Sequence, residues 1–185
     1  MTAPLGIAAQ HVLPQHSLTA LVYRLTRCRV PWAKNILIQS FCRKYHVNLA
    51  EAEQSDATAY PTFNAFFTRA LRAGARPVDP AKETLVSPVD GYVSQIGRIR
   101  DELLVQAKGR EYTVAALLGG TAADAAHFAN GIFATFYLAP HNYHRIHMPC
   151  AARLRHMRYV PGRLFSVSDA SVANIDRLFA RNERL

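Results

Sequence analysis

The pattern of apolar residues changes near residue 80, and this change constrains the fold more than any other feature of the sequence. Up to that point, apolar residues recur at helical spacing, as they do between residues 17 and 25. A stretch with one glycine and two prolines, residues 74–80, then interrupts the pattern. Beyond it, short β-like runs alternate with turn residues. The sequence therefore predicts an α+β fold, with N-terminal amphipathic helices in residues 1–80 and a β-rich catalytic core in residues 81–185.

The helical spacing and the β-like runs of apolar residues also predict the individual helices and strands. Helices are predicted over residues 18–25, 32–46, 112–118, 122–128 and 172–179, with a further one opening at Thr62. Strands are predicted over residues 85–86, 92–99, 103–106, 131–138 and 154–160. Ser17 and Thr62 are candidate N-caps, because a hydroxyl can accept a hydrogen bond from the first turn of a helix. Residues 1–16 are expected to lie outside regular structure.

The positive charge of the chain is concentrated near its N-terminus. The net charge is +9, and the first acidic residue is Glu51. Before it come six basic residues, namely Arg24, Arg27, Arg29, Lys34, Arg43 and Lys44. Two basic amphipathic helices without acidic residues are typical of a segment that docks on an anionic membrane surface. The alternative is a helical pair packed on the main domain. The absence of acids favours the membrane, and residues 1–80 are expected to form the docking region.

Other classes of protein fit the composition poorly. The three cysteines, Cys28, Cys42 and Cys150, give neither a disulfide framework nor a zinc knuckle, so a reducing compartment fits best. No run reaches the ~18 apolar residues of a spanning helix, and the N-terminus does not resemble a secretory signal. The basic segment lacks the interleaved aromatics and motifs of nucleic-acid binders, so nucleic acid is not expected as a partner.

A histidine-rich run indicates proton transfer. His141, His144 and His147 are spaced by three residues, and prolines at 140 and 149 flank them. The prolines argue against a helix, and no acid lies within the run to complete a ligand set, so no metal site is predicted. Imidazole has an unperturbed pKa close to physiological pH, which suits it to general acid–base chemistry. Surface or structural histidines in a loop are the alternative.

Asp90 is the candidate carboxylate. It lies in the run Ser-Pro-Val-Asp-Gly, residues 87–91, which is also a common turn sequence. A structural turn is one interpretation. The other is a carboxylate that fixes the tautomer of an imidazole while the imidazole takes a proton from a hydroxyl.

Several short runs give the chain a resemblance to one enzyme family. They appear in the order that the family has and extend over nearly the whole chain. The turn at 87–91 together with the His-Arg-Ile-His-Met-Pro run is the most specific combination. The runs are 63–69, 76–77, 87–91, 143–149, 160–162, 164–167 and 178–184. On these residues the chain resembles the bacterial, pyruvoyl-dependent phosphatidylserine decarboxylases.

The resemblance implies an activity and a set of roles. Members of the family convert phosphatidylserine to phosphatidylethanolamine in phospholipid biosynthesis. Their cofactor is a covalent pyruvoyl group, made from a serine of the same chain when the proenzyme cleaves itself. By motif match, Asp90 and His147 would form a triad with that serine, and His144 would act at the pyruvoyl centre during decarboxylation. Arg145 could bind a phosphate or carboxylate, or could form a plain structural ion pair.

The sequence departs from the family pattern at two places. Asn142 stands where many relatives carry aspartate. No Gly-Ser dipeptide occurs in the chain, and the run Leu-Gly-Gly-Thr at 118–121 lacks the serine and lies in the wrong part of the order. We therefore expect a core that is incomplete at the C-terminus, with the pyruvoyl-forming serine outside this chain, and we expect this chain alone to be inactive.

The expected partners and location follow from the same interpretation. The partners are an anionic phospholipid membrane, phosphatidylserine and a missing C-terminal subunit that bears the pyruvoyl group, and a homodimer is also considered. The expected location is peripheral, on the cytoplasmic face of the bacterial cell membrane. The alternative function is a membrane- or lipid-binding fragment without catalysis.

Overall fold

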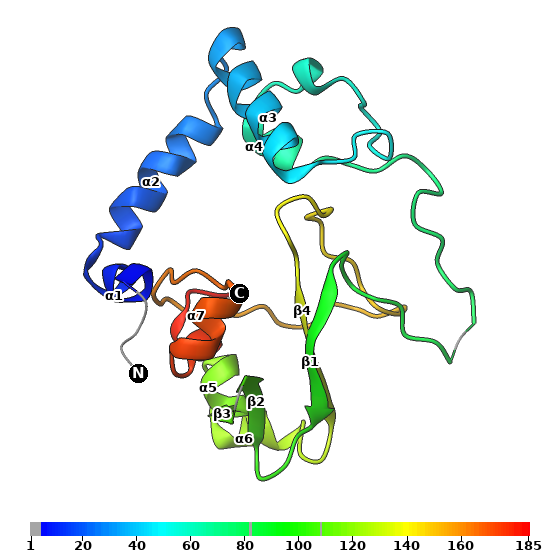
Figure 1. The fold of residues 1–185 in the computed structure, drawn as a ribbon. Coiled ribbons are helices and arrows are strands. Elements are labelled where there is room, and N and C mark those ends of the chain that lie inside the picture. The colour runs from blue at the N-terminus through cyan, green and yellow to red at the C-terminus, as the bar shows by residue number, and fades with distance from the viewer. Residues whose placement is uncertain (1–4, 82, 108) are drawn as a thin grey trace. The chain divides into compact units, whose positions relative to one another are not determined.

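The computed structural model of this chain describes residues 5–81, 83–107 and 109–185. It divides into two compact units, and each is described by itself. The first unit contains the residues up to Thr19, Val93–Thr135 and Leu154–Leu185, and the second contains Ala20–Tyr92 and Phe136–Arg153. Helices dominate the N-terminal part, and small sheets follow (Figure 1). The predicted α+β class is confirmed.

The second unit is built around two helices that lie side by side, α3 (Pro31–Tyr45) and α4 (Phe63–Phe67) (Figure 1). Helix α2 (Gln15–Thr26) precedes them, and a 3₁₀ helix, η1 (Ala57–Ala59), lies between them in sequence. Pro31 starts α3, where its missing N–H costs nothing. The Thr62 side chain accepts a hydrogen bond from the Ala65 N–H and caps α4, as predicted. Ile38, Tyr60 and Phe66 form the buried core of this unit.

The first unit combines two small sheets with short helices. Strand β1 (Tyr92–Arg98) pairs with β4 (Ile132–Tyr137), and β2 (Leu103–Ala107) pairs antiparallel with β3 (Arg110–Thr113), with Leu103 opposite Thr113. The helices of this unit are α1 (Leu5–Val12), α5 (Val114–Leu118), α6 (Ala122–Ala126), α7 (Asp169–Asn174) and α8 (Leu178–Arg181). The core around the sheets contains Ile99, Leu104, Tyr112, Val114 and Ala125.

One buried amide ties the C-terminal helices to strand β2. The Gln106 side chain donates to the carbonyls of Val172 and Ile175, at 2.8 Å each, and accepts from the Leu178 N–H at 2.7 Å. Gln106 is almost fully buried. Its side chain therefore satisfies backbone groups that would otherwise be buried without partners between α7 and α8.

Several elements differ from the sequence prediction. Residues 5–12 form helix α1 although they were expected to be irregular, because Ile7 is buried against residues far along the chain. The predicted helix 172–179 is broken into α7 and α8, since Ile175 is extended and Arg177 has a φ of 53°. Residues 154–159 do not form the predicted strand, and only Val160 makes an isolated bridge, to Arg184.

Helix α2 also differs in where it begins. It starts at Gln15, so Ser17 lies inside the helix and does not cap it. None of the residues of α2 is buried, and Leu21, Val22 and Leu25 are each more than half exposed. Among the helices in the described ranges, none combines the length and apolar character that crossing a bilayer requires.

Candidate active site

The bend that carries Asp90 requires a glycine at the next position. Gly91 has a φ of +133°, and a β-carbon there would overlap the carbonyl oxygen of Tyr137. Only glycine tolerates both conditions. Before it, the Ser87 hydroxyl donates to the carbonyl of Val89 at 2.6 Å. The chain bends at residues 88–91, and this bend presents the carboxylate.

The histidine run is a loop that follows β4, and it lies alongside the Asp90 bend. The His147 N–H donates to the carbonyl of Pro88 at 2.8 Å, and the Val86 N–H donates to the carbonyl of Pro149 at 2.9 Å. The loop opens with a tight turn in which the Asn142 side chain accepts from the Ala139 N–H at 2.6 Å. An aspartate at 142 could accept the same bond, so the departure at this position preserves the turn.

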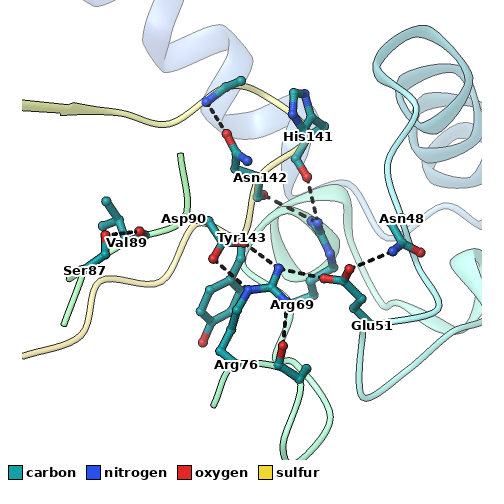
Figure 2. Close-up of polar contacts among 12 residues, drawn as sticks. Asn48, Glu51, Arg69, Arg76, Ser87, Val89, Asp90, His141, Asn142 and Tyr143 are labelled. Atoms are coloured by element: carbon teal, nitrogen blue, oxygen red, sulfur yellow. Dashed lines mark hydrogen bonds and ion pairs between the residues drawn. The ribbon is translucent and has the colours of Figure 1, made fainter. Parts of the chain in front are cut away.

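Asp90 is held by a bidentate ion pair with Arg76. The Arg76 Nε and Nη2 atoms donate to the two carboxylate oxygens of Asp90 at 2.9 and 2.7 Å. Nη2 also donates to Glu51 at 2.6 Å, so that the guanidinium lies between two carboxylates (Figure 2). Hydrogen bonds from Arg76 hold the pKa of Asp90 below its usual value, and a hydrogen bond from the backbone N–H of Tyr143 adds a smaller shift in the same direction. Asp90 is therefore ionised at neutral pH.

Tyr143 contacts both of the predicted processing residues. Its backbone N–H bonds the Asp90 carboxylate, and its hydroxyl lies 2.9 Å from Nε2 of His147. The two rings are stacked with their centroids 5.5 Å apart. Because Tyr143 is buried whereas His147 is exposed, the tyrosine is the more fixed partner. The phenol can donate to Nε2, which would place the proton of neutral His147 on Nδ1.

A cavity of about 630 Å³ joins these groups. Asp90, Tyr143, Arg145 and His147 line it, together with parts of the segments 70–78 and 86–89. Within the described parts of the chain, Asp90 and His147 share this cavity without a direct hydrogen bond. A carboxylate, a phenol and an imidazole around one cavity have the composition of a general acid–base centre.

His144 lies in a different environment from His147. Its ring is stacked on Phe67, with centroids 4.0 Å apart and an interplanar angle of 24°. Burial lowers the pKa of His144, and hydrogen bonds to the carbonyls of Ala139 and Pro140 oppose the shift. Nε2 is buried and has no hydrogen-bond partner among the described residues. A neutral imidazole with one nitrogen held and the other unpaired is prepared to exchange a proton with a group placed beside it.

The remaining residues of the run have structural contacts. Arg145 Nε donates to the carbonyl of Thr68 at 2.8 Å, and its side chain is exposed on the cavity wall. The His141 carbonyl accepts from Arg69 at 3.1 Å (Figure 2). In the described ranges, no group of three or more His, Cys, Asp and Glu side chains is placed to hold a metal ion.

Sequence reasoning assigned no role to Arg76, Tyr143 or Phe67. Each lies in a run that carries the family resemblance, which was a signal that these positions matter. Their partners are distant in sequence, however, and Arg76 is separated from Glu51 by 25 positions. A single sequence therefore gives no means of pairing them.

Comparison with known proteins identifies the family. A family model described as phosphatidylserine decarboxylase matches residues 63–185, more than half of the chain, and one described as PSD matches residues 5–46. Proenzymes of phosphatidylserine decarboxylase from Azotobacter vinelandii, Nitrosococcus oceani and Pseudomonas fluorescens are 52%, 55% and 51% identical to this chain. These matches cover 98%, 95% and 100% of this chain, but 63%, 58% and 64% of the relatives.

The family that matches is one of decarboxylases, which are lyases. The chain belongs to the phosphatidylserine decarboxylase family, and the resemblance stated from the sequence motifs is confirmed. It spans about three fifths of the length of the curated relatives named above.

Proposed function

We propose that this chain is part of an enzyme that decarboxylates phosphatidylserine to phosphatidylethanolamine after cleaving itself. The observation that carries the proposal is the single cavity shared by Asp90, Tyr143 and His147. In this proposal, His147 takes the proton of a serine hydroxyl during self-cleavage. Asp90, whose pKa is lowered by hydrogen bonds from Arg76, stabilises the imidazolium that forms. The serine itself would come from outside these 185 residues, since the sequence contains no Gly-Ser dipeptide.

The residues near His144 fit the pyruvoyl group that this activity requires. The buried Nε2 of His144 is without a hydrogen-bond partner among the described residues, so it can exchange a proton with the pyruvoyl-bound substrate without the loss of a protein hydrogen bond. When bound, the pyruvoyl group accepts the electrons left on the α-carbon as carbon dioxide departs. His144 would then deliver a proton to that carbon. Its lowered pKa favours release of the proton once Nε2 has taken one up.

Mutants of the protein produced from the whole reading frame would test these roles. We expect Asp90→Asn and His147→Ala to remain uncleaved on a denaturing gel. We expect His144→Ala to be cleaved but to release no carbon dioxide from carboxyl-labelled phosphatidylserine. His127→Ala is the matched control, because this histidine belongs to the first unit, and it should behave as wild type. Normal cleavage of His147→Ala would show the processing role to be wrong.

We further propose that residues 1–80 dock the protein on an anionic membrane. The apolar residues of α2 support this, since Leu21 and Leu25 are 54% and 57% exposed, and Trp32 at the start of α3 is 71% exposed. No acidic residue precedes Glu51 to oppose binding to anionic lipid. Cys28, Cys42 and Cys150 are free thiols, in keeping with a peripheral protein on the cytoplasmic face of the bacterial cell membrane. A homodimer stays a prediction.

Vesicle flotation would test the docking region and separate the two candidate functions. We expect binding to vesicles that contain phosphatidylserine, with weaker binding at high salt and to purely zwitterionic vesicles. Leu21→Asp and Leu25→Asp should reduce the bound fraction severalfold, because each places a charge among exposed apolar groups. Leu154→Asp is the matched control, because Leu154 is 69% exposed and lies outside residues 1–80 and outside the helices. If flotation persists while the protein from the whole reading frame shows no turnover, the lipid-binding alternative is favoured.

A further inference from the structure

Three consecutive residues at the end of α4 contact the histidine loop. The Phe67 ring lies against the His144 ring, with centroids 4.0 Å apart. The Thr68 carbonyl accepts from Arg145 Nε at 2.8 Å. Arg69 Nη2 donates to the carbonyl of His141 at 3.1 Å. One short segment, more than 70 positions earlier in the chain, therefore contacts the His144 ring, the Arg145 side chain and the His141 backbone of the loop.

The segment is itself well anchored, so it can impose a position on the loop. Phe66, next to Phe67, is fully buried in the core of the second unit. Phe63, one turn earlier, lies nearly parallel to Phe67, with ring centroids 6.0 Å apart and an interplanar angle of 19°. The Thr68 hydroxyl donates back to the Asn64 carbonyl at 2.9 Å and closes the helix end.

Arg69 places a buried cation close to His144. Its side chain is only 4% exposed, lies over the Phe66 ring at 5.5 Å, and has two nitrogens, Nε and Nη1, without partners among the described residues. A guanidinium in such a site repels a second positive charge. Burial is the largest cause of the lowered pKa of His144, and hydrogen bonds to the carbonyls of Ala139 and Pro140 oppose it. The electrostatic effects of Arg69 and His141 are smaller, and both lower the pKa further. No carboxylate is among the groups that shift it.

We propose that Phe67 and Arg69 are positioning residues that keep the His144 imidazole neutral and in one orientation, with Nε2 left free for the reaction. The stack fixes the plane of the ring. The carbonyls of Ala139 and Pro140 hold the ring through its hydrogen bonds, and because Nε2 is unpaired, Nδ1 is the nitrogen that donates to them. The role of His144 in the reaction rests on the proposed function, whereas its neutral state and orientation do not.

Histidine titration by NMR tests the positioning directly in the 185-residue chain. We expect the wild-type His144 ring to titrate below the ~6.5 of a free histidine. Phe67→Leu should raise its midpoint because it loosens the cover of the ring, and Arg69→Gln should raise it because a neutral side chain replaces the cation. Arg69→Lys, which keeps the charge, and Phe67→Tyr, which keeps the stack, should stay close to wild type.

A phenylalanine of the first unit serves as the control. Phe128→Leu removes an exposed phenylalanine of the first unit and should not move the His144 midpoint. If Phe67→Leu does not fold, Arg69→Gln decides the question. A folded Arg69→Gln with an unchanged His144 midpoint, or a wild-type ring that titrates like a free histidine, would overturn the proposal.

A second readout separates this inference from the proposed function. In the protein produced from the whole reading frame, Arg69→Gln should shift the pH profile of kcat in the same direction as the NMR midpoint. If the midpoint moves and the pH profile does not, the positioning stands, and the assignment of His144 to decarboxylation fails.

Discussion

Replacement of Arg76 by methionine should destabilise the second unit through the loss of two ion pairs at once. The Arg76 side chain is 43% exposed, whereas those of Glu51 and Asp90 are 34% and 19% exposed. Ion pairs at such partly exposed sites contribute ~0.2–1 kcal/mol each, and bidentate geometry belongs at the upper end of that range. We therefore expect Arg76→Met to lower the free energy of unfolding by about 1 kcal/mol at pH 7, and Glu51→Gln to lower it by less than half as much.

The loss of unfolding free energy in Arg76→Met should depend on pH, because the Asp90 carboxylate can be protonated. Because hydrogen bonds from Arg76 lower the pKa of Asp90 in the folded protein, the contribution is fully present above the unfolded value of about 4. It is lost as the pH falls through the lower, folded pKa. The difference between wild type and Arg76→Met should therefore be constant between about pH 5 and pH 8 and should narrow below about pH 4.

Urea unfolding followed by far-UV circular dichroism would measure this difference. Arg72→Met is the matched control, because it makes the same chemical change at an exposed arginine in the same segment, whose side chain forms none of the ion pairs found among the described residues. Equal unfolding free energies for Arg76→Met and Arg72→Met would refute the reasoning, as would a difference that widens in acid.

Three other substitutions test separate contacts. Tyr143→Phe removes the hydroxyl 2.9 Å from His147 Nε2, and loss of one positioning hydrogen bond should slow self-cleavage about tenfold; cleavage at the wild-type rate would show that the phenol does not orient the imidazole. Phe66→Ala should cost about 3–5 kcal/mol of unfolding free energy, measured in urea, since the ring is fully buried; a cost below about 1 kcal/mol would contradict the core described above. Gln106→Leu leaves three buried backbone groups without partners and should cost more than about 2 kcal/mol, and an unchanged unfolding midpoint would argue against the role of this amide.

The sequence predicted the elements whose own residues determine them. The helix around residues 32–46 and the strand 92–99 were found within one residue of the expected bounds, because apolar spacing and flanking breakers mark both. Helix α1 was missed, because it is stabilised by contacts of Ile7 and Gln10 with residues more than 150 positions away. The break between α7 and α8 was missed for a related reason, since Gln106 compensates the backbone groups that the break leaves unpaired.

For the candidate site, the sequence indicated the candidate residues but not their side-chain partners. The motifs placed Asp90 and His147 on two segments, and the structure brings both to one cavity. The roles assigned to them and to His144 stay predictions. The Arg76 ion pairs and the stack of Phe67 on His144 could not be predicted, because each joins residues whose separation in sequence carries no period or motif. Side-chain partners of this kind become visible only when the segments are placed in space.

The glycine at position 91 limits how this bend can be redesigned. Its backbone is so close to the Tyr137 carbonyl that any larger residue must push apart the two strands that leave the site, whatever the chemistry of the new side chain. A library randomised at this codon and selected only for soluble expression should therefore return almost nothing but the parental amino acid. Tolerance to substitution at a position beside a catalytic candidate would in this case report on the geometry of the main chain and would not measure any demand of the reaction.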